Sequence, residues 1–362
     1  MMKIDIASSD DSRLIITDVL DGEGAQRTEP AGKAVEQHDD FIWTAVHPEG
    51  IGNVTAFEFS MLDFAYGTRA VVEGSRKNAE ARPWVSRNDS TVAQEYTIEP
   101  AKGQQLTIFK YVGIASTDAF LDPSKTARAA AVAARKTGWK KLIAEHKACW
   151  EALWQDADIE IPGKDVEELQ ISVRASLFHL LANVRSETEG EAIGDNSIPV
   201  GGLSSESYAG LVFWDADLWM LPSLLVLHPE HAASINNYRY KLLPQARENA
   251  KEYGLEGALY PWTSARYGNC TGTGPCADYQ YHLNTDIALV HWHQFLTTGD
   301  IAWFKEKGWP VIEAVAQMWS GLVDVAPADD EDGLKKGMYT VNNMTDPVCL
   351  PAPPHDDLRS MD

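Results

Sequence analysis

The chain has 362 residues, of which 53 are acidic and 31 basic, so its formal net charge at pH 7 is -22. A surface this acidic repels phosphate backbones and anionic lipid headgroups, and the sequence contains no basic patch that would offset the repulsion, which excludes nucleic acid as an expected partner. The length predicts two domains, while a hydrophobic fraction of 44% excludes global disorder.

Three further properties of the whole chain narrow the class of protein. No apolar run approaches the roughly 18 residues that cross a bilayer, so no membrane span is expected. The first residues, MMKIDIASSDDSR, lack the hydrophobic region of a signal peptide. The chain also contains 12 tryptophans, whose flat rings suit either a large core or the faces of sugar rings.

The predicted fold class is α+β with several domains. Residues 1–125 are predicted to form an antiparallel β-sandwich, because alternating apolar and polar residues recur between Gly, Pro and Asp. Residues 126–163 are rich in Ala, Lys and Leu and predict linker helices, with Trp150 and Trp154 one turn apart on one face. Segments with this β pattern are 54–62, 69–74, 95–100 and 105–116.

Residues 164–347 are predicted to be mostly helical. Apolar residues recur there at three- and four-residue spacing, and the helices are separated by long loops dense in aromatic and polar residues, which favours an (α/α)6 toroid with a pocket at one end. The helices are expected within 166–187, 229–254, 285–300 and 309–323.

Several patterns that resemble cofactor or metal sites fail on their context. Gly272, Gly274 and Ala277 match a dinucleotide fingerprint, but no strand precedes them. His291 and His293 face different sides of a predicted helix, and the pair His228 and His231 has no third ligand nearby. The acidic run at 329–333 lacks the spacing of a calcium loop and is interpreted as an exposed turn. No metal and no cofactor are therefore expected.

Two patterns indicate export. Four glycosylation sequons begin at Asn53, Asn88, Asn269 and Asn343, where chance would give roughly one or two. Cys270 and Cys276 enclose a five-residue loop that a disulfide could close if the protein is exported, whereas in a reducing cytosol they would be two thiols.

The segment 201–222 is the main candidate for chemistry. It places Trp214 beside Asp215, followed by Asp217 and Trp219. A sugar site needs such a pair, an aromatic plate for the ring face and a carboxylate that accepts hydrogen bonds from neighbouring hydroxyls. The alternative is that Asp215 caps a helix while the tryptophans are buried in its packing.

Four blocks in order carry a family resemblance: PVGGLSSESYAGLVFWDADLWM (199–220), HPEHAASINNYR (228–239), GALYPWTSARYGNCTGTGPCADYQYHLNTDIA (257–288) and MYTVNNMTDP (338–347). Together they resemble the fungal acid trehalases of glycoside hydrolase family 65. The resemblance implies that residues 1–125 form part of the family's N-terminal sandwich and that residues 164–347 form an incomplete toroid.

The resemblance implies an inverting glycosidase that hydrolyses α,α-trehalose to glucose. The tryptophan and aspartate that hold the non-reducing glucose in the family fall on Trp214 and Asp215, and Asp217, Trp262 and His282 would line the same pocket. A disaccharide phosphorylase of the same family and a non-catalytic sugar-binding remnant are the alternatives. An extracellular, cell-wall or vacuolar location is expected.

The sequence departs from the family pattern near its end. The family's general acid is the glutamate of a TDPDEY-like segment, but this chain reads TDPVC, so that Cys349 occupies the expected position of the acid. The remaining residues, 348–362, lose the likeness altogether. The sequence thus predicts a truncated chain with an aberrant tail, no identified catalytic acid and no activity of its own.

Overall fold

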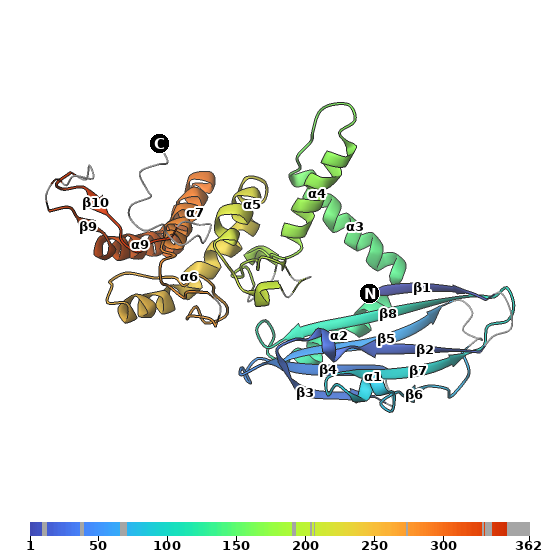
Figure 1. Ribbon diagram of the computed structural model, residues 1–362. Coiled ribbons are helices and arrows are strands. Elements are labelled where there is room, and N and C mark those ends of the chain that lie inside the picture. Colours follow the sequence, from blue (N-terminus) through green and yellow to red (C-terminus); the bar gives the residue numbers. More distant parts are fainter. Residues whose placement is uncertain are drawn as a thin grey trace. The chain divides into compact units, whose positions relative to one another are not determined.

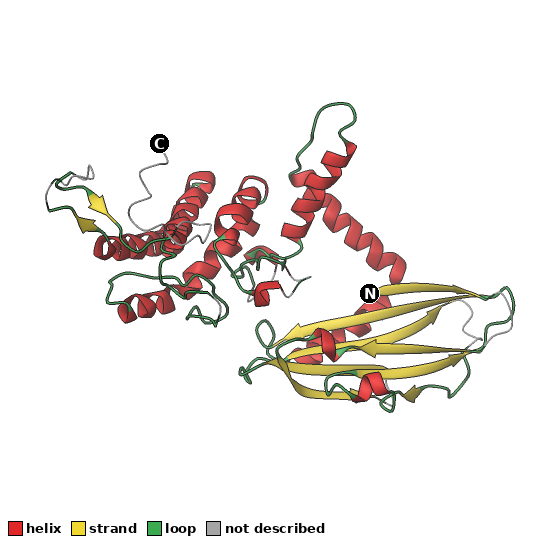
Figure 2. Ribbon diagram, viewed as in Figure 1, coloured by secondary structure: helices red, strands yellow, loops and turns green. Residues whose placement is uncertain are grey.

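The computed structural model describes residues 1–8, 13–36, 40–65, 71–189, 193–202, 205, 207–272, 274–327, 329 and 335–345. Within these residues, long strands occupy the first part of the chain and helices most of the rest (Figure 2). This order confirms the predicted change from β to α structure. Contacts divide the chain into two units, Met1–Trp154 and Gln155–Asp362.

The first unit contains two antiparallel sheets. One has the strand order β1-β8-β5-β4-β3 and the other the order β2-β7-β6. Two short helices, η1 (Gly22–Gly24) and α1 (Pro83–Ser86), lie in its loops. The strands are β1 (Met2–Ala7), β2 (Leu14–Leu20), β3 (Thr28–Val35), β4 (Phe41–Pro48), β5 (Ala56–Ala65), β6 (Lys77–Asn78), β7 (Val92–Ile98) and β8 (Gln105–Ser116).

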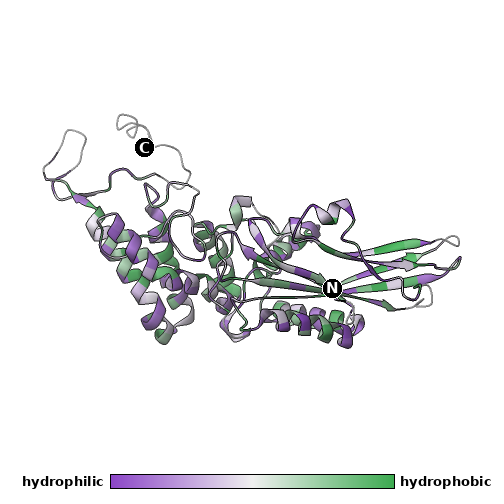
Figure 3. Ribbon diagram, turned by 90° about the horizontal axis from the view of Figure 1, so that it is seen from below, coloured by the Kyte–Doolittle hydropathy of each residue, from purple (hydrophilic) through white to green (hydrophobic). Residues whose placement is uncertain are grey.

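Alternation along the strands builds two cores on opposite faces of the larger sheet. Figure 3 shows hydrophilic and hydrophobic residues interspersed along these strands. On β8, Leu106 and Ile108 pack against Ile98 of the smaller sheet, while Phe109 and Tyr111 belong to a cluster on the other face. Successive strand residues point to opposite faces, so one strand serves both cores. The first core joins the two sheets and confirms the predicted β-sandwich.

Helix α2 (Pro123–Thr137) covers the second core of the first unit (Figure 1). Its approach to β8 is so close that a Cβ at Gly113 would lie 2.0 Å from the Ala127 carbonyl oxygen. The chain turns at Gly138 into α3 (Trp139–Asp156), on which Trp150 and Trp154 lie one turn apart as predicted, and their rings stack. The contact division therefore groups α2 with the sandwich, whereas the sequence predicts a separate linker at 126–163.

A carboxylate lies buried between the two sheets. Asp18, with a completely buried side chain, faces the Lys110 ammonium at 2.8 Å. Its oxygens also accept hydrogen bonds from the Ser60 hydroxyl at 3.1 Å and the Gln94 amide at 2.9 Å. The interior of the sandwich therefore holds a polar network in which every partner of Asp18 is supplied by the strands.

The second unit is helical, and its long helices fall where the sequence predicts them. Pro229 occupies the first turn of α6, and Gly254 follows its end, in keeping with the start and stop signals. The helices are α4 (Glu167–Leu181), η3 (Glu187–Glu189), η5 (Ser207–Gly210), η6 (Ala216–Met220), α5 (Leu221–Leu227), α6 (Pro229–Glu252), α7 (His282–Thr298), α8 (Ile301–Trp303), η7 (Phe304–Gly308) and α9 (Trp309–Leu322).

Helices α5, α6, α7 and α9 pack against one another around the core of the second unit. The loop that follows α6 approaches α9 closely, since Ala258 N donates to the Ala314 carbonyl at 3.0 Å. A Cβ at Gly257 would lie 2.0 Å from that same oxygen, so only glycine fits there. A two-stranded ribbon, β9 (Asp324–Val325) and β10 (Tyr339–Thr340), follows α9. Closure of these helices into a toroid stays a prediction.

Candidate functional site

Three of the predicted sugar-binding residues meet in the second unit. The His282 ring, at the first residue of α7, lies 5.2 Å from the Trp214 ring and 5.8 Å from the Trp262 ring, measured between centroids. Both contacts are edge-to-face. These residues are far apart in the sequence, and the fold brings them together. The exposed ring of Trp219 lies beside Trp214 at 5.6 Å.

A short backbone pairing brings the two tryptophans together. Val212 N donates to the Ser264 carbonyl at 2.9 Å, and Ser264 N donates to the Val212 carbonyl at 3.0 Å. Each tryptophan is two residues from this isolated bridge. Phe213 adds an edge-to-face contact with Trp262 at 5.8 Å. The segment before η6 and the loop before α7 therefore form one surface.

His282 is held at both ring nitrogens. Its Nδ1 lies 2.8 Å from an Asp286 carboxylate oxygen, one turn further along α7, and its Nε2 lies 3.0 Å from the Gln280 side-chain oxygen. Two polar partners on opposite edges fix the plane of the ring. The ring is thereby oriented toward the tryptophans.

Asp215 differs from its neighbours because its carboxylate is unpartnered. The residue is half-buried, and its side chain makes no hydrogen bond or ion pair with any residue that the structure describes. It precedes η6, but its side chain accepts no capping hydrogen bond from that helix, so the helix-capping alternative is wrong for this structure. A carboxylate next to an aromatic ring and free of partners can accept hydrogen bonds from two sugar hydroxyls.

Asp217 and Arg239 form a buried pair in the same unit. Arg239 donates from Nε to one Asp217 oxygen at 3.1 Å and from Nη2 to the other at 2.5 Å, and both side chains are completely buried. Burial raises the pKa of Asp217, and the guanidinium opposes that rise. Direct contact of Asp217 with a sugar stays a prediction, while the geometry fits a positioning role.

Arg239 is a site residue that the sequence did not single out. Besides Asp217, it donates to the Phe213 carbonyl at 3.3 Å and to the Ser264 hydroxyl at 3.2 Å. Its own carbonyl accepts a hydrogen bond from the Tyr260 hydroxyl at 3.0 Å. One buried cation thus ties together the segments that carry both tryptophans. The resemblance block at 228–239 was the available signal.

The predicted disulfide between Cys270 and Cys276 is present, with the two Cα atoms 5.1 Å apart. Its loop packs on the site, because Trp262 N donates to the Cys276 carbonyl at 2.6 Å. Gly274 has a φ of +76°, and a Cβ there would lie 2.6 Å from Cδ1 of Trp262. The disulfide loop therefore supports the position of the Trp262 ring.

The segment predicted to carry the catalytic acid begins beside the site. Thr345 N donates to the Tyr279 carbonyl at 2.9 Å, three residues before His282. Cys349 and the rest of the tail at 348–362 lie outside the described residues. The acidic run at 329–333 also lies outside them except for Asp329.

The four sequon asparagines differ in accessibility. Asn53, Asn269 and Asn343 are exposed. Asn88 is half-buried, and its side-chain oxygen accepts hydrogen bonds from Ser90 N and Thr91 N. Three of the four positions thus offer an accessible amide, while glycosylation itself stays a prediction.

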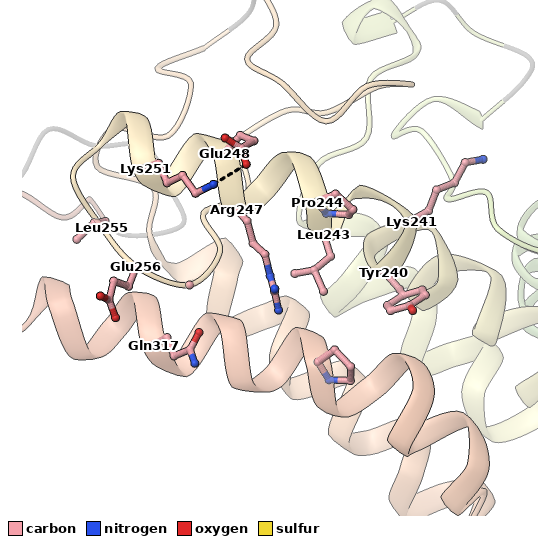
Figure 4. A pocket seen from close by; sticks show the side chains of 12 residues that line it. Tyr240, Lys241, Leu243, Pro244, Arg247, Glu248, Lys251, Leu255, Glu256 and Gln317 are labelled. Atoms are coloured by element: carbon pink, nitrogen blue, oxygen red, sulfur yellow. Dashed lines mark hydrogen bonds and ion pairs between the residues drawn. The ribbon is translucent and has the colours of Figure 1, made fainter.

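A groove of the second unit is separate from this site. A groove of about 750 Å³ lies between α6 and α9, where Arg247 reaches across it and Lys251 pairs with Glu248 at 2.7 Å (Figure 4). None of the predicted sugar-binding residues lines it. Among the described residues, no group of three His, Cys, Asp or Glu side chains could hold a metal ion, and no helix is long and apolar enough to cross a membrane.

Comparison with protein families gives two matches that follow one another along the chain. Residues 1–153 match the N-terminal domain of glycosyl hydrolase family 65, and residues 174–347 match the central catalytic domain of the same family. The boundary between the matched regions lies close to the division between the two structural units.

Individual relatives agree with these matches. A cell wall acid trehalase from Arthroderma benhamiae is 38% identical over 372 residues, covering 96% of this chain and 34% of the relative. A kojibiose phosphorylase from Halothermothrix orenii is 28% identical over 325 residues, covering 83% of this chain and 39% of the relative. The chain thus spans little more than a third of the length of these proteins.

One solved structure shares the fold. A putative kojibiose phosphorylase from the human microbiome superposes with a TM-score of 0.73 at 19% identity, covering 95% of this chain and 43% of its own. The two proteins therefore share a β-sandwich followed by packed helices.

Proposed function

Because the chain belongs to glycosyl hydrolase family 65, we propose that it is an acid-trehalase-type glycosidase chain that binds the non-reducing glucose of α,α-trehalose at Trp214 and Asp215. The observation that carries the proposal is the half-buried Asp215 carboxylate, which has no partner among the described residues and lies beside a ring that contacts His282. Identity to acid trehalases supports trehalose as the substrate.

The residues on this surface have different roles in binding the sugar. The Asp215 carboxylate accepts hydrogen bonds from two adjacent hydroxyls of the sugar, and the ring of Trp214 covers its apolar face. Trp262 and His282 close the surface at the sides, with Asp286 and Gln280 holding the imidazole. Preorganised groups of this kind lower the ordering cost of binding.

Inverting hydrolysis requires two carboxyl groups about 6.5–9.5 Å apart. One protonates the glycosidic oxygen as the bond to the anomeric carbon breaks, and the other removes a proton from the attacking water. The position expected for the acid holds Cys349, whose thiol is a weaker acid than a carboxyl group. We therefore propose that the 362-residue chain binds trehalose without hydrolysing it.

Two alternatives belong to the same family. A disaccharide phosphorylase would attack the anomeric carbon with inorganic phosphate instead of water, and the identity to a kojibiose phosphorylase favours this reading. A non-catalytic sugar-binding remnant agrees with the cysteine at the acid position. Trehalase relatives at higher identity favour the hydrolase as the ancestral activity.

An extracellular location fits the same proposal. The relative from Arthroderma benhamiae is a cell wall protein, and the disulfide between Cys270 and Cys276 would persist in an oxidising compartment. More specifically, we propose that the protein is located in the cell wall or the vacuole.

Replacement of the free carboxylate tests the proposed site. Asp215→Asn should raise the Kd for trehalose about 10- to 100-fold, because a hydrogen bond to a charged group contributes about 1.5–3 kcal/mol. Titration calorimetry measures the change. Glu256→Gln, an exposed carboxylate in the α6–α9 groove, is the control and should bind as the parent does. Equal affinity of the Asp215→Asn variant and the parent would refute the site.

Product analysis separates the proposed activities. The purified chain is incubated with trehalose, with and without inorganic phosphate, and glucose and glucose phosphate are measured. No product is expected in either case. Glucose without phosphate would show hydrolysis and contradict the inactivity, whereas glucose phosphate that appears only with phosphate would establish the phosphorylase alternative.

A further inference from the structure

A second pocket lies at the opposite end of α7 from the candidate site. Its volume is about 490 Å³, and it is bounded by the loop around Glu187, the start of α6, the end of α7 and Trp303. His282 begins α7, while Thr297 and Thr298 end it, so about 22 Å of helix separates the two places. None of the residues that line this pocket is part of the site at Trp214 and Asp215.

Trp303 supplies an aromatic wall whose position is fixed. Its ring stacks on the buried ring of His291 at 5.9 Å with an interplanar angle of 21°. Its indole nitrogen donates to the Asn237 side-chain oxygen at 3.1 Å. The ring edge packs against Gly308, where a Cβ would lie 2.9 Å from it. A ring held in this way is a preorganised contact surface.

Gln294 supplies an amide donor at the wall of the pocket. The side chain is only 4% exposed, and its oxygen accepts a hydrogen bond from Asn236 at 2.6 Å. Its amide nitrogen donates to no residue that the structure describes, although Gln294 lines the pocket. Although the residue is largely buried, this nitrogen reaches solvent, so it can donate to a ligand oxygen that enters the pocket.

The carboxylates of the pocket supply acceptors. One oxygen of Glu187 accepts from Asn237 at 3.0 Å and from Lys307 at 2.7 Å, while no described residue bonds the other. Glu230 lines the same wall. Asp300 is a third carboxylate of the lining, and no Lys or Arg is among the residues that line the pocket, a composition that disfavours an anionic ligand.

From this combination we propose that the Trp303 pocket binds a neutral carbohydrate of one or two hexose rings, at a place distinct from the candidate active site. The indole face packs on the apolar face of the ring, the Gln294 amide donates to a hydroxyl oxygen, and Glu187 and Glu230 accept from hydroxyl hydrogens. The size falls within the range of small-molecule sites. The inference rests on the pocket and is independent of the proposed function.

The test uses the intact chain labelled with ¹⁵N at its tryptophans, and glucose, trehalose and maltose as probes. The indole N–H signal of Trp303, identified by its loss in Trp303→Phe, should shift saturably on addition of at least one of these sugars. The shift should persist in Asp215→Asn, because that variant weakens only the other site.

Two variants of neighbouring residues make the test specific. Thr297→Trp places a large ring at the pocket wall and should raise the Kd reported by Trp303 at least tenfold. Leu296→Trp adds the same ring one position earlier, at a 61% exposed residue that does not line the pocket, and should leave that Kd unchanged. If Trp303→Phe does not fold, the number of sugars bound per chain can be measured by calorimetry for both variants instead of by the indole signal.

The outcomes separate this inference from the proposed function. Two sugars bound per parent chain, reduced to one by Asp215→Asn and to one by Thr297→Trp, support both. A single sugar lost only in Asp215→Asn overturns the second pocket, and a single sugar lost only in Thr297→Trp supports the pocket and overturns the proposed site. A Trp303 response to Ca²⁺ or Mg²⁺ with none to the three sugars overturns the carbohydrate assignment.

Discussion

Each unit of the molecule buries an ion pair, yet the two pairs have different surroundings. Asp18 in the sandwich is paired with Lys110, and Asp217 in the helical unit is paired with Arg239. Lys110, Ser60 and Gln94 all bond the Asp18 carboxylate between the two sheets. Asp217, in contrast, lies two residues after Asp215, whose carboxylate has no partner among the described residues. The buried ion pairs therefore hold their surroundings in place, whereas a neighbouring carboxylate without a described partner is a candidate for binding a ligand.

Local backbone geometry explains the difference. Strand residues alternate, so Asp18 on β2 and Ser60 on β5 point to the same interior and satisfy each other. In the helical unit, a π-helix, η6, instead follows Trp214 and Asp215 directly and widens the turn after them. That turn buries Asp217 while Asp215 stays partly accessible. π turns of this kind occur often at functional sites.

Breaking the pair in the helical unit should have the largest effect on stability. Arg239→Met leaves Asp217 buried without its cation, which should lower the free energy of unfolding by about 3–5 kcal/mol. Urea denaturation followed by circular dichroism measures the loss. The double variant Asp217→Leu, Arg239→Met removes both charges and should regain most of it. If Arg239→Met unfolds at the same urea concentration as the parent, the pair contributes nothing.

Acid should weaken the helical unit through His291, whereas the Asp18 network contains no histidine. Burial lowers the pKa of His291 to about 4, against about 6.5 in an unfolded chain. The unfolded chain thus takes up the proton first, so stability is complete above about pH 6.5 and falls by about 3 kcal/mol as the pH drops to 4. Burial also lowers the pKa of His228, in the same direction.

The variant His291→Gln isolates this contribution. Urea unfolding at a series of pH values between 4 and 8 should give a flatter profile for the variant than for the parent below pH 6.5. Parallel profiles over the whole range would mean that His291 takes up its proton equally in both states.

Removing the cation of the sandwich should have a smaller effect, confined to the first unit. Lys110 retains 19% exposure of its side chain, so water partly replaces it in Lys110→Met and the loss should be about 2 kcal/mol. Hydrogen exchange should accelerate in β2, β5 and β8 and stay unchanged in α6 and α7. Acceleration in the helices as well would show that the two units unfold together.

The smallest effect on stability, about 1 kcal/mol, is expected for Gly274→Ala in the disulfide loop. Its effect on binding should be larger, because the added Cβ would lie 2.6 Å from the Trp262 ring and displace it. The Kd for trehalose should rise severalfold. Gly272→Ala, which has no atom within 4 Å of its new Cβ, is the matched control and should bind normally. If the two variants bind trehalose with equal affinity, the Trp262 ring is not part of the binding site.

The fold could be predicted from the sequence where local signals were strong. The alternating run 105–116 coincides with β8, and Pro229 begins α6 as expected. The strand predicted at 69–74 fails in its described part, where Val71 forms only an isolated bridge with Ile98. The two π turns were not predicted, since a single wide turn leaves no periodic pattern in the sequence.

The sequence was sufficient to name most residues of the candidate site but not to assign the role of each. Trp214, Trp262 and His282 were named from the motifs and do meet. Arg239 was missed because its partner Asp217 belongs to another element, and helical periodicity gives the face of a residue but not its partner. The division between a free Asp215 and a buried Asp217 could not be inferred from spacing alone.

The pairing of Val212 with Ser264 has a consequence for binding kinetics. Two hydrogen bonds join segments that are far apart in the chain, and each segment contributes one wall of the proposed sugar-binding surface. Any local opening that breaks them would separate Trp214 from Trp262 and let the ligand escape without unfolding the helices. At the proposed sugar-binding site, the opening rate of this two-residue pairing would then limit the lifetime of a bound sugar, so residence time and the stability of the pairing should change together.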